Sequence, residues 1–209
     1  MTDYKLNIQF DSNGLRTLEA ASQKVVIVKT TTPSTLPVAW VAFTPEETNT
    51  ISWTEAYSVY GSTTQIGDGA IIETLSTNTA NGGFTYTFSG GLFDDGQSNL
   101  PNNEYGIVNN DSDSQCKLLT AGLAQVANGG GSGGVLTPLN ATVVPYNETG
   151  TYTPVEKVQV FTAANMSNGL VISEIQSNAI EVDLTETTEL AIHYDDNENV
   201  FVLAWVSER

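Results

Sequence analysis

Hydrophobic and polar residues alternate with a period of two along most of the chain. In residues 4–10, for example, Tyr4, Leu6, Ile8 and Phe10 lie on one face of an extended segment and polar residues lie on the other. The same alternation, or a short run of apolar residues, predicts further strands at residues 24–29, 38–43, 50–60, 70–75, 84–88, 135–136, 141–144, 151–161, 170–175, 180–184, 190–194 and 200–206. Segments rich in Gly, Asn, Asp and Ser separate these runs, as expected of turns. The pattern therefore predicts an all-β fold, and the spacing of the strands favours a β-sandwich.

Helix signals are weak by comparison. Residues 15–21 predict one or two helical turns. Residues 117–126 fit either a short helix or a strand, and we favour the strand. Residues 128–134, with the sequence NGGGSGG, predict a flexible surface loop.

A stretch of about thirty residues occurs twice. Residues 47–78 align with residues 148–178 when one residue near Asp68 is omitted, and eight of the 31 aligned pairs are identical, where chance would give about two. The dipeptides Asp68-Gly69 and Asn168-Gly169 occupy matched positions and suit turns with positive φ. The repetition predicts two tandem homologous repeats of about 100 residues, 1–104 and 105–209.

Two packings of these repeats remain open. They could form two small sandwiches, or one larger sandwich with pseudo-two-fold symmetry. Residues 94–103 between them contain no long proline-rich or charged linker, so we expect the halves to pack closely.

Charge excludes some partners. With 24 acidic and 7 basic residues the net charge is −17, which repels phosphate backbones, so we expect no nucleic-acid binding. Only 15% of the residues are charged, so Thr, Ser, Asn and Gln must supply most of the polar surface. The chain has no apolar run long enough for a membrane helix and does not begin with a signal-peptide pattern. We expect a soluble protein that is cytoplasmic or released without a cleaved signal.

Catalytic motifs are weak. His193 is the single histidine and Cys116 the single cysteine, so no disulfide within the chain and no typical zinc site can form. Glu55 and Glu156 occupy equivalent positions in the two repeats and could be a glycosidase pair, but a shared structural contact is the simpler interpretation. We expect no enzyme activity and no required cofactor. Calcium is the candidate ion, with Asp94, Asp95, Asp195 and Asp196 as its first candidate ligands.

Aromatic residues suggest a ligand site. Trp40, Trp53 and Trp205 lie in apolar alternating runs and are expected in the core. Trp53, however, aligns with Pro154, so the Trp53 ring could instead lie outward or at an edge. An exposed Trp53 with Tyr57, Asn49 and Asp68 nearby would suit stacking and hydrogen bonding to a sugar.

These features favour a non-catalytic, lectin-like recognition protein that binds a glycan or a cell-surface receptor. One alternative is a β-sandwich toxin, pore-forming, insecticidal or cytolytic, which would contact a membrane only in forming a pore. A second alternative is a structural protein that self-assembles, so a homo-oligomer is also a candidate state.

Overall fold

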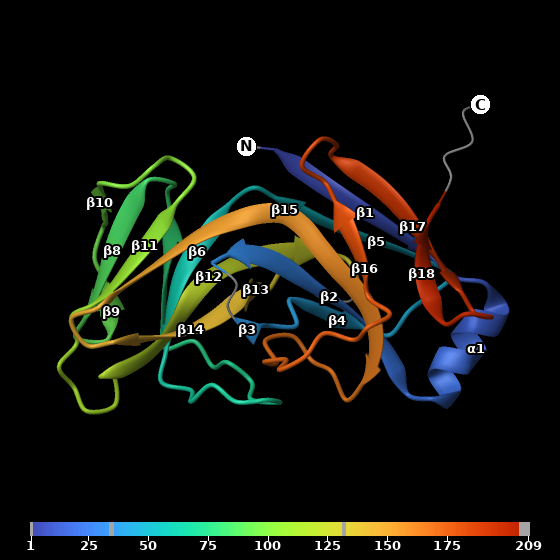
Figure 1. Ribbon diagram of the computed structural model, residues 1–209, viewed down its shortest axis with the longest axis horizontal. Helices are drawn as coiled ribbons and strands as arrows, with labels where there is room; N and C mark the ends of the chain where they lie inside the picture. The colour runs from blue at the N-terminus through green and yellow to red at the C-terminus, as the bar shows by residue number, and fades with distance from the viewer. Residues whose placement is uncertain (1, 34–35, 131–132, 205–209) are drawn as a thin grey trace.

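The computed structural model describes residues 2–33, 36–130 and 133–204, and in these ranges the protein is almost entirely β (Figure 1). The elements before residue 100 are β1 (Asp3–Gln9), α1 (Ser12–Ala20), β2 (Gln23–Thr32), β3 (Leu36–Pro37), β4 (Val41–Phe43), β5 (Thr48–Thr54), β6 (Tyr57–Ser62), β7 (Ser76–Ala80), β8 (Phe84–Ser89), β9 (Leu92–Phe93) and β10 (Gln97–Ser98). Those after it are β11 (Tyr105–Asn109), β12 (Leu118–Asn128), β13 (Leu136–Pro138), β14 (Asn140–Pro145), β15 (Thr149–Ala164), β16 (Ile180–Asp183), β17 (Glu189–Asp195) and β18 (Val200–Leu203).

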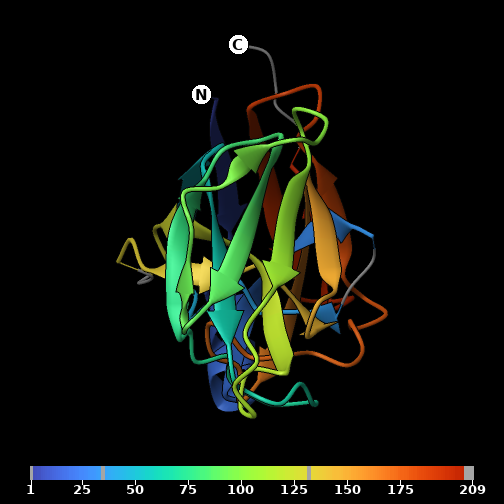
Figure 2. The ribbon, with the colours of Figure 1, turned by 90° about the vertical axis from the view of Figure 1, so that its left-hand side faces the viewer.

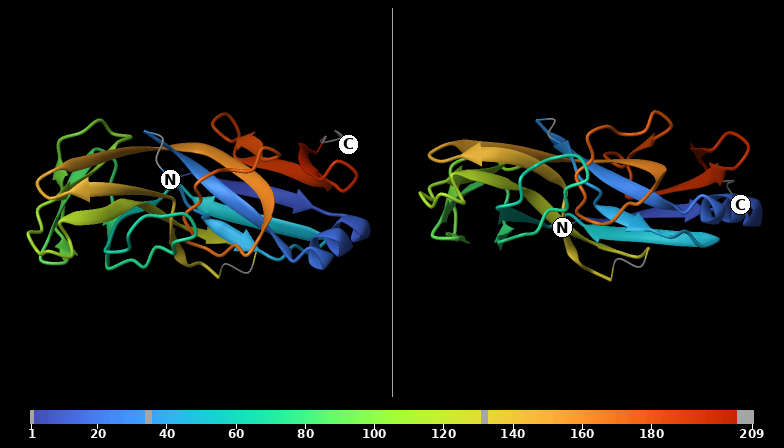
Figure 3. Two further views of the ribbon diagram at one scale, coloured as in Figure 1. Left: turned by 60° about the horizontal axis from the view of Figure 1, so that its bottom comes forward. Right: turned by 90° about the horizontal axis from the view of Figure 1, so that it is seen from below.

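Two curled sheets pack against each other as in a β-sandwich. In the first sheet the strand order is β18-β17-β1-β5-β12-β14-β3, with β13, β6 and β7 paired beside this path. In the second sheet it is β10-β8-β11-β15-β2-β4, with β16 and β9 at its sides. Figure 1 shows β15 crossing the front of the molecule beside β2, with β5 and β12 in the layer behind, and Figure 3 shows the same layers from below.

Each sheet takes strands from both halves of the chain. The pair β1–β17 and the pair β8–β11 are parallel, and each joins a strand from one half to a strand from the other. Figure 2 shows the end of the molecule formed by β8 and β11. The boundary between residues 104 and 105 as a division into repeats stays a prediction.

The strands form where one face of an alternating segment is buried. Leu6 and Ile8 of β1 are fully buried, and Leu6 lies opposite Ile51 of β5 in the antiparallel register. The largest hydrophobic cluster fills the space between the sheets and includes Trp40, Trp53 and Phe88. The predicted all-β sandwich is confirmed at this level, because both sheets bury their inner faces in this cluster.

Two loops cover the outer faces of the sheets. Residues 165–179 pack on Val28 and Phe161 on the outside of the second sheet, and residues 63–75 pack on Tyr60 and Ala124 on the outside of the first. The two loops meet at an isolated bridge between Ile71 and Leu170. Continuous strands at 70–75 and 170–175 were therefore wrong predictions, since these apolar residues cover a sheet instead of joining one.

Residues 50–60 form two strands, β5 and β6, separated at Glu55 and Ala56, whereas the aligned second copy forms the single strand β15 with a register irregularity between Pro154 and Val158. Residues 117–126 lie almost wholly in the strand β12, as favoured. The predicted helical turns belong to α1, which begins where the Asp11 carboxylate accepts the backbone N–H groups of Asn13 and Gly14.

Some sequence predictions concern residues that lie outside the described part. Trp205 is one of them, and the loop at 128–134 is described only at its two ends. At the matched turns, Gly69 and Gly169 both have positive φ, 75° and 80°, as expected. Within the described ranges, no helix is both long and apolar enough to span a membrane.

Candidate functional site

The four residues predicted to bind a ligand do not form a surface site. Trp53 of β5 and Tyr57 of β6 are only 2% and 3% exposed. The idea that the Trp53 ring faces outward is therefore wrong, while its alternative, a core position, is confirmed, as it is for Trp40. The Trp53 ring stacks on Tyr4 at 5.7 Å between ring centroids, so it fills the core. Pro154, its aligned partner, lies at the register irregularity of β15.

Asn49 and Asp68 have structural contacts of their own. The side chain of Asn49 is buried and exchanges two hydrogen bonds with the backbone of Glu46, at 3.0 and 2.7 Å. Asp68 is exposed in the loop 63–75, and its carboxylate accepts the backbone N–H of Ser173 at 3.1 Å. Binding of a ligand at these residues stays a prediction, but the aromatic rings of Trp53 and Tyr57 are buried and are not exposed for stacking on a sugar.

A polar cluster lies inside the hydrophobic core, and sequence inspection did not predict it. Its centre is Lys29 of β2, whose side chain is 0% exposed. The Lys29 Nζ donates to both carboxylate oxygens of Glu156 on β15, at 2.8 and 2.9 Å, and to Oε1 of Gln125 on β12, at 2.9 Å. A further bond of 3.2 Å runs to the Tyr57 hydroxyl. The cluster thus connects both sheets.

Other polar groups fix the orientation of this cluster. The Glu156 carboxylate also accepts the Tyr57 hydroxyl and, at 3.0 Å, the indole N–H of Trp53. The Gln125 amide nitrogen donates to the Thr54 carbonyl at 2.8 Å. The Lys29 Nζ lies over the rings of Trp40, Trp53 and Tyr57, 5.1–5.6 Å from their centroids. Every polar group at the centre therefore has a partner, which a buried charge requires.

Burial controls the protonation of the cluster. Removal from water lowers the pKa of Lys29 from its usual 10.5 to about 8, against the opposing attraction of Glu156. Removal from water, followed by the charge of Glu156, raises the pKa of Tyr57. The cluster therefore combines a lysine that loses its proton more easily than usual with a neutral phenol.

The two glutamates equivalent by sequence occupy different environments. Glu156 is 9% exposed and belongs to the polar cluster, whereas Glu55 lies exposed at the break between β5 and β6. Glu156 is bound in a buried ion pair with Lys29, whereas Glu55 is exposed, which differs from the two carboxylates that flank a glycosidic bond in a glycosidase. The sequence match at this position is therefore not evidence for a glycosidase pair.

The candidate calcium ligands lie at two distant turns. Asp94 and Asp95 follow β9, while Asp195 ends β17 and Asp196 follows it, at the opposite end of the molecule near α1 (Figure 1). One oxygen of Asp94 accepts the backbone N–H groups of Thr87 on β8 and of Gly96, and one oxygen of Asp195 accepts those of Asn197 and Glu198 in its own turn. Among the residues with described positions, no group of three or more His, Cys, Asp and Glu side chains is placed to hold a metal ion. Calcium binding stays a prediction, and the two turns would have to bind separate ions.

His193 and Cys116 lie in ordinary surroundings. His193 is exposed on β17, and Cys116 is 6% exposed with its thiol pKa raised by burial and by the nearby Asp111 and Asp113. A raised pKa lowers the reactivity of a thiol at neutral pH.

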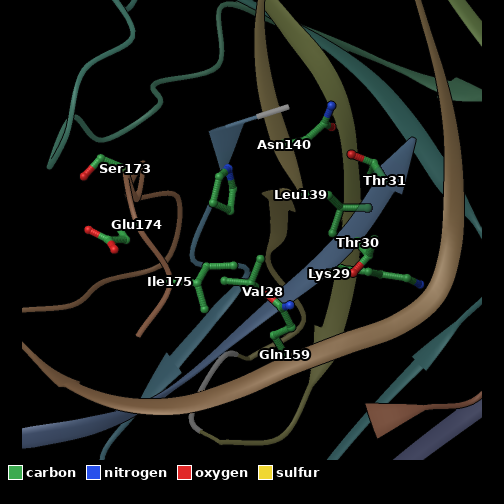
Figure 4. A pocket seen from close by; sticks show the side chains of 11 residues that line it. Val28, Lys29, Thr30, Thr31, Leu139, Asn140, Gln159, Ser173, Glu174 and Ile175 are labelled. Atoms are coloured by element: carbon green, nitrogen blue, oxygen red, sulfur yellow. The ribbon is translucent and has the colours of Figure 1, made fainter. Parts of the chain in front are cut away.

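A surface groove lies on the outer side of the second sheet (Figure 4). It encloses about 410 Å³ between the 173–175 segment on one side and β2, β3, β14 and β15 on the other. Val28, Ile175 and Leu139 provide apolar contacts, and polar groups come from Thr30, Thr31, Asn140, Gln159, Ser173 and Glu174. The Lys29 side chain points away from the 173–175 segment in Figure 4 and toward the interior cluster.

Several polar groups of the groove are available to a ligand. In the part of the chain that the structure describes, the side chains of Gln159 and Glu174 have no hydrogen bond or ion pair. Asn140 is 1% exposed, its Oδ1 accepts the Leu123 N–H at 2.9 Å, and its Nδ2 has no partner. An unpaired buried donor costs about 1–3 kcal/mol, but this nitrogen is buried and does not face the open groove.

Known proteins offer no guide to this site, because no family model, no curated protein and no solved structure matches the chain.

Proposed function

We propose that the protein is a non-catalytic, lectin-like recognition module that binds a glycan in the groove beside the 173–175 segment. The observation that carries the proposal is the lining of this groove, where amide, hydroxyl and single carboxylate groups surround an apolar floor. Sugars present hydroxyl groups and C–H faces together, which such a lining can recognise. A volume of about 410 Å³ lies within the range of small-molecule pockets, about 300–1,000 Å³.

A glycan array tests this function. We expect wild-type protein to bind at least one class of glycan, and Gln159→Ala and Glu174→Ala to weaken that binding. Gln9→Ala, which removes an exposed amide from β1 outside the groove, is the matched control and should bind as the wild type does. Absence of binding to every glycan would refute the recognition proposal, whereas binding unchanged by both groove variants would move the site elsewhere.

We also infer that the sandwich consists of two tandem homologous repeats related by pseudo-two-fold symmetry. The strand order supports this inference. Strands of the first sheet can be matched to strands of the second: β1 to β11, β5 with β6 to β15, β12 to β2, β14 to β4, and β17 to β8. With these matches, the order β17-β1-β5-β12-β14 in the first sheet becomes β8-β11-β15-β2-β4, which is the order observed in the second sheet. The two parallel pairs correspond as well, since β1–β17 becomes β11–β8.

The same correspondence between strands relates two residues of the polar cluster to each other. Val28 lies opposite Gln159, and Ala124 lies opposite Ser58, which aligns with Gln159. Lys29 and Gln125, the next residues, are therefore equivalent, and they meet in the cluster at the centre of the molecule.

A further inference from the structure

The side chains of Lys29 and Gln125 are in direct contact inside the core. Their atoms Nζ and Oε1 are 2.9 Å apart, so the amine lies beside the side-chain carbonyl group of the glutamine. One bond holds the side-chain amide in this orientation, because its nitrogen donates to the Thr54 carbonyl at 2.8 Å. The backbone carbonyl of Gln125 separately accepts the Trp40 indole N–H at 3.1 Å, which fixes the main chain at this position. Both residues are at most 2% exposed, so water does not compete for the carbonyl carbon.

We propose that Lys29 and Gln125 react to form an isopeptide bond between Nζ and Cδ, with release of ammonia. Glu156 is the proton carrier, since its two oxygens are 2.8 and 2.9 Å from Nζ. The bond would join β2 of one sheet covalently to β12 of the other. The inference does not depend on glycan binding.

The reaction balances with groups that the chain itself supplies. The Lys29 ammonium first gives a proton to the Glu156 carboxylate, and the neutral amine attacks Cδ of Gln125. The new C–N bond forms as the carbonyl π electrons move to Oε1. A second amine proton then passes to Nε2, the Cδ–Nε2 bond breaks, and the carbonyl re-forms. Ammonia takes the remaining proton from Glu156 and leaves as ammonium, so Glu156 ends as a carboxylate.

The surroundings favour each of these steps. Burial lowers the pKa of Lys29 to about 8, so the neutral amine is more accessible than in an exposed lysine. Fixed neighbours replace a bimolecular encounter, which lowers the entropic barrier. The amide of Gln125 is the electrophile because a carboxylate such as Glu156 is deactivated by its charge. The departing nitrogen lies beside Thr54, which lines an open pocket of about 210 Å³.

The mass of the intact protein tests the proposal. For a chain of 22.3 kDa, denatured wild-type protein should be lighter than its sequence mass by one ammonia molecule, about 17 Da. Proteolysis and tandem mass spectrometry should then find one branched peptide that contains both Lys29 and Gln125. This measurement needs no variant and does not require the protein to remain folded during analysis.

Substitutions test the role of each residue in the proposed reaction. Lys29→Arg removes the amine, and Gln125→Glu replaces the amide with a carboxylate of nearly the same shape, so both should have the full sequence mass. Glu156→Gln should slow the appearance of the lighter species. Lys24→Arg, on the same strand β2 but bonded to the Met166 carbonyl, is the matched control and should still lose ammonia.

Two results would overturn the proposal. One is wild-type protein that keeps its full sequence mass after prolonged incubation at mildly alkaline pH, which would show that the cluster is only a buried ion pair. The other is loss of water, about 18 Da, with a branch at Glu156, which would exclude Gln125 as the electrophile.

Discussion

At the scale of single residues, the interior polar cluster depends on aromatic side chains. Trp53 stacks on Tyr4, meets Trp40 edge to face at 5.3 Å between centroids, and donates to Glu156. These contacts exclude water from Lys29 on one side, and the chemistry of the cluster depends on that exclusion. Trp53 is therefore a structural residue of the cluster and not a surface for stacking sugars.

Trp53→Ala is expected to lower the free energy of unfolding by about 3–5 kcal/mol, because it leaves a cavity and an unpaired acceptor. Urea denaturation measures this loss. Tyr146→Ala removes an aromatic ring that is 39% exposed and should change stability by less than about 0.5 kcal/mol. Equal effects of the two substitutions would contradict the assignment of Trp53 to the core.

Tyr60 predicts a dependence of stability on pH. Its pKa is raised by full burial and by Tyr152, and its hydroxyl donates to the Asn140 carbonyl at 2.6 Å. In the unfolded chain a tyrosine loses its proton near pH 10, while folded Tyr60 keeps it. Above that pH the folded state binds more protons than the unfolded state, so stability falls by about 1.4 kcal/mol per pH unit for this residue.

Tyr60→Phe is expected to cost about 1 kcal/mol at neutral pH through the lost hydrogen bond. Because phenylalanine does not titrate, the difference from the wild type should narrow as the pH rises above about 10. Unfolding free energies measured from pH 7 to about 11 test this. A constant difference over the whole range would contradict the buried, neutral state of Tyr60.

At the scale of elements, the two covering loops are distinct from the strands that they cover. Loop 63–75 is held to the second loop by backbone bonds from Gly69 to Val171, 3.0 Å, and from Ile72 to Gly169, 2.9 Å. Gly69 has a φ of 75°, and a Cβ there would meet no atom within 4 Å. Its conformation, and not crowding, therefore requires glycine.

Gly69→Ala should destabilise the loop by about 1 kcal/mol, seen as faster hydrogen exchange at the backbone amides of position 69 and of Val171. Gly67→Ala is the matched control, since a Cβ at Gly67 also meets nothing and φ there is not positive. Equal exchange rates in the two variants would mean that the turn does not hold the loop.

Element prediction succeeded where a segment buries only one face. In β1 the alternation of buried Leu6 and Ile8 with polar residues directly gives an extended strand. It failed at 70–75 and 170–175, since apolar residues that cover a sheet show the same local pattern as residues within one. It also missed short edge strands such as β9 and β10, which have too few residues for a period to be visible.

The interior cluster had one local signal. Lys29 follows Val25 and Ile27 at intervals of two, so alternation places it on the buried face of β2. Its partners Gln125 and Glu156 lie 96 and 127 residues away on other strands, and no local pattern connects them. The groove depends on the same long-range packing, because the 173–175 segment and β14 meet only in the folded chain.

At the scale of the whole molecule, the halves are interleaved. β2 pairs with β15 over most of its length, and β12 pairs with β5 and β6, so the central strands of each half have partners from the other half. A half on its own would expose the central edges of these strands, and exposed apolar edges favour aggregation. Unlike two independent domains in tandem, each half therefore needs the other half in order to fold.

Separate chains of residues 1–104 and 105–209 test this dependence. We expect each chain alone to lack a cooperative unfolding transition, and an equimolar mixture to regain the far-ultraviolet β spectrum and thermal transition of the intact protein. The intact chain refolded at the same concentration is the control. Because β2 would then belong to one chain and β12 and β15 to the other, the mixture should also recover the loss of ammonia, now as a covalent link between the two chains at Lys29 and Gln125. A half that folds alone as a stable monomer would contradict the interleaving, since strands such as β2 and β15 would then not need each other.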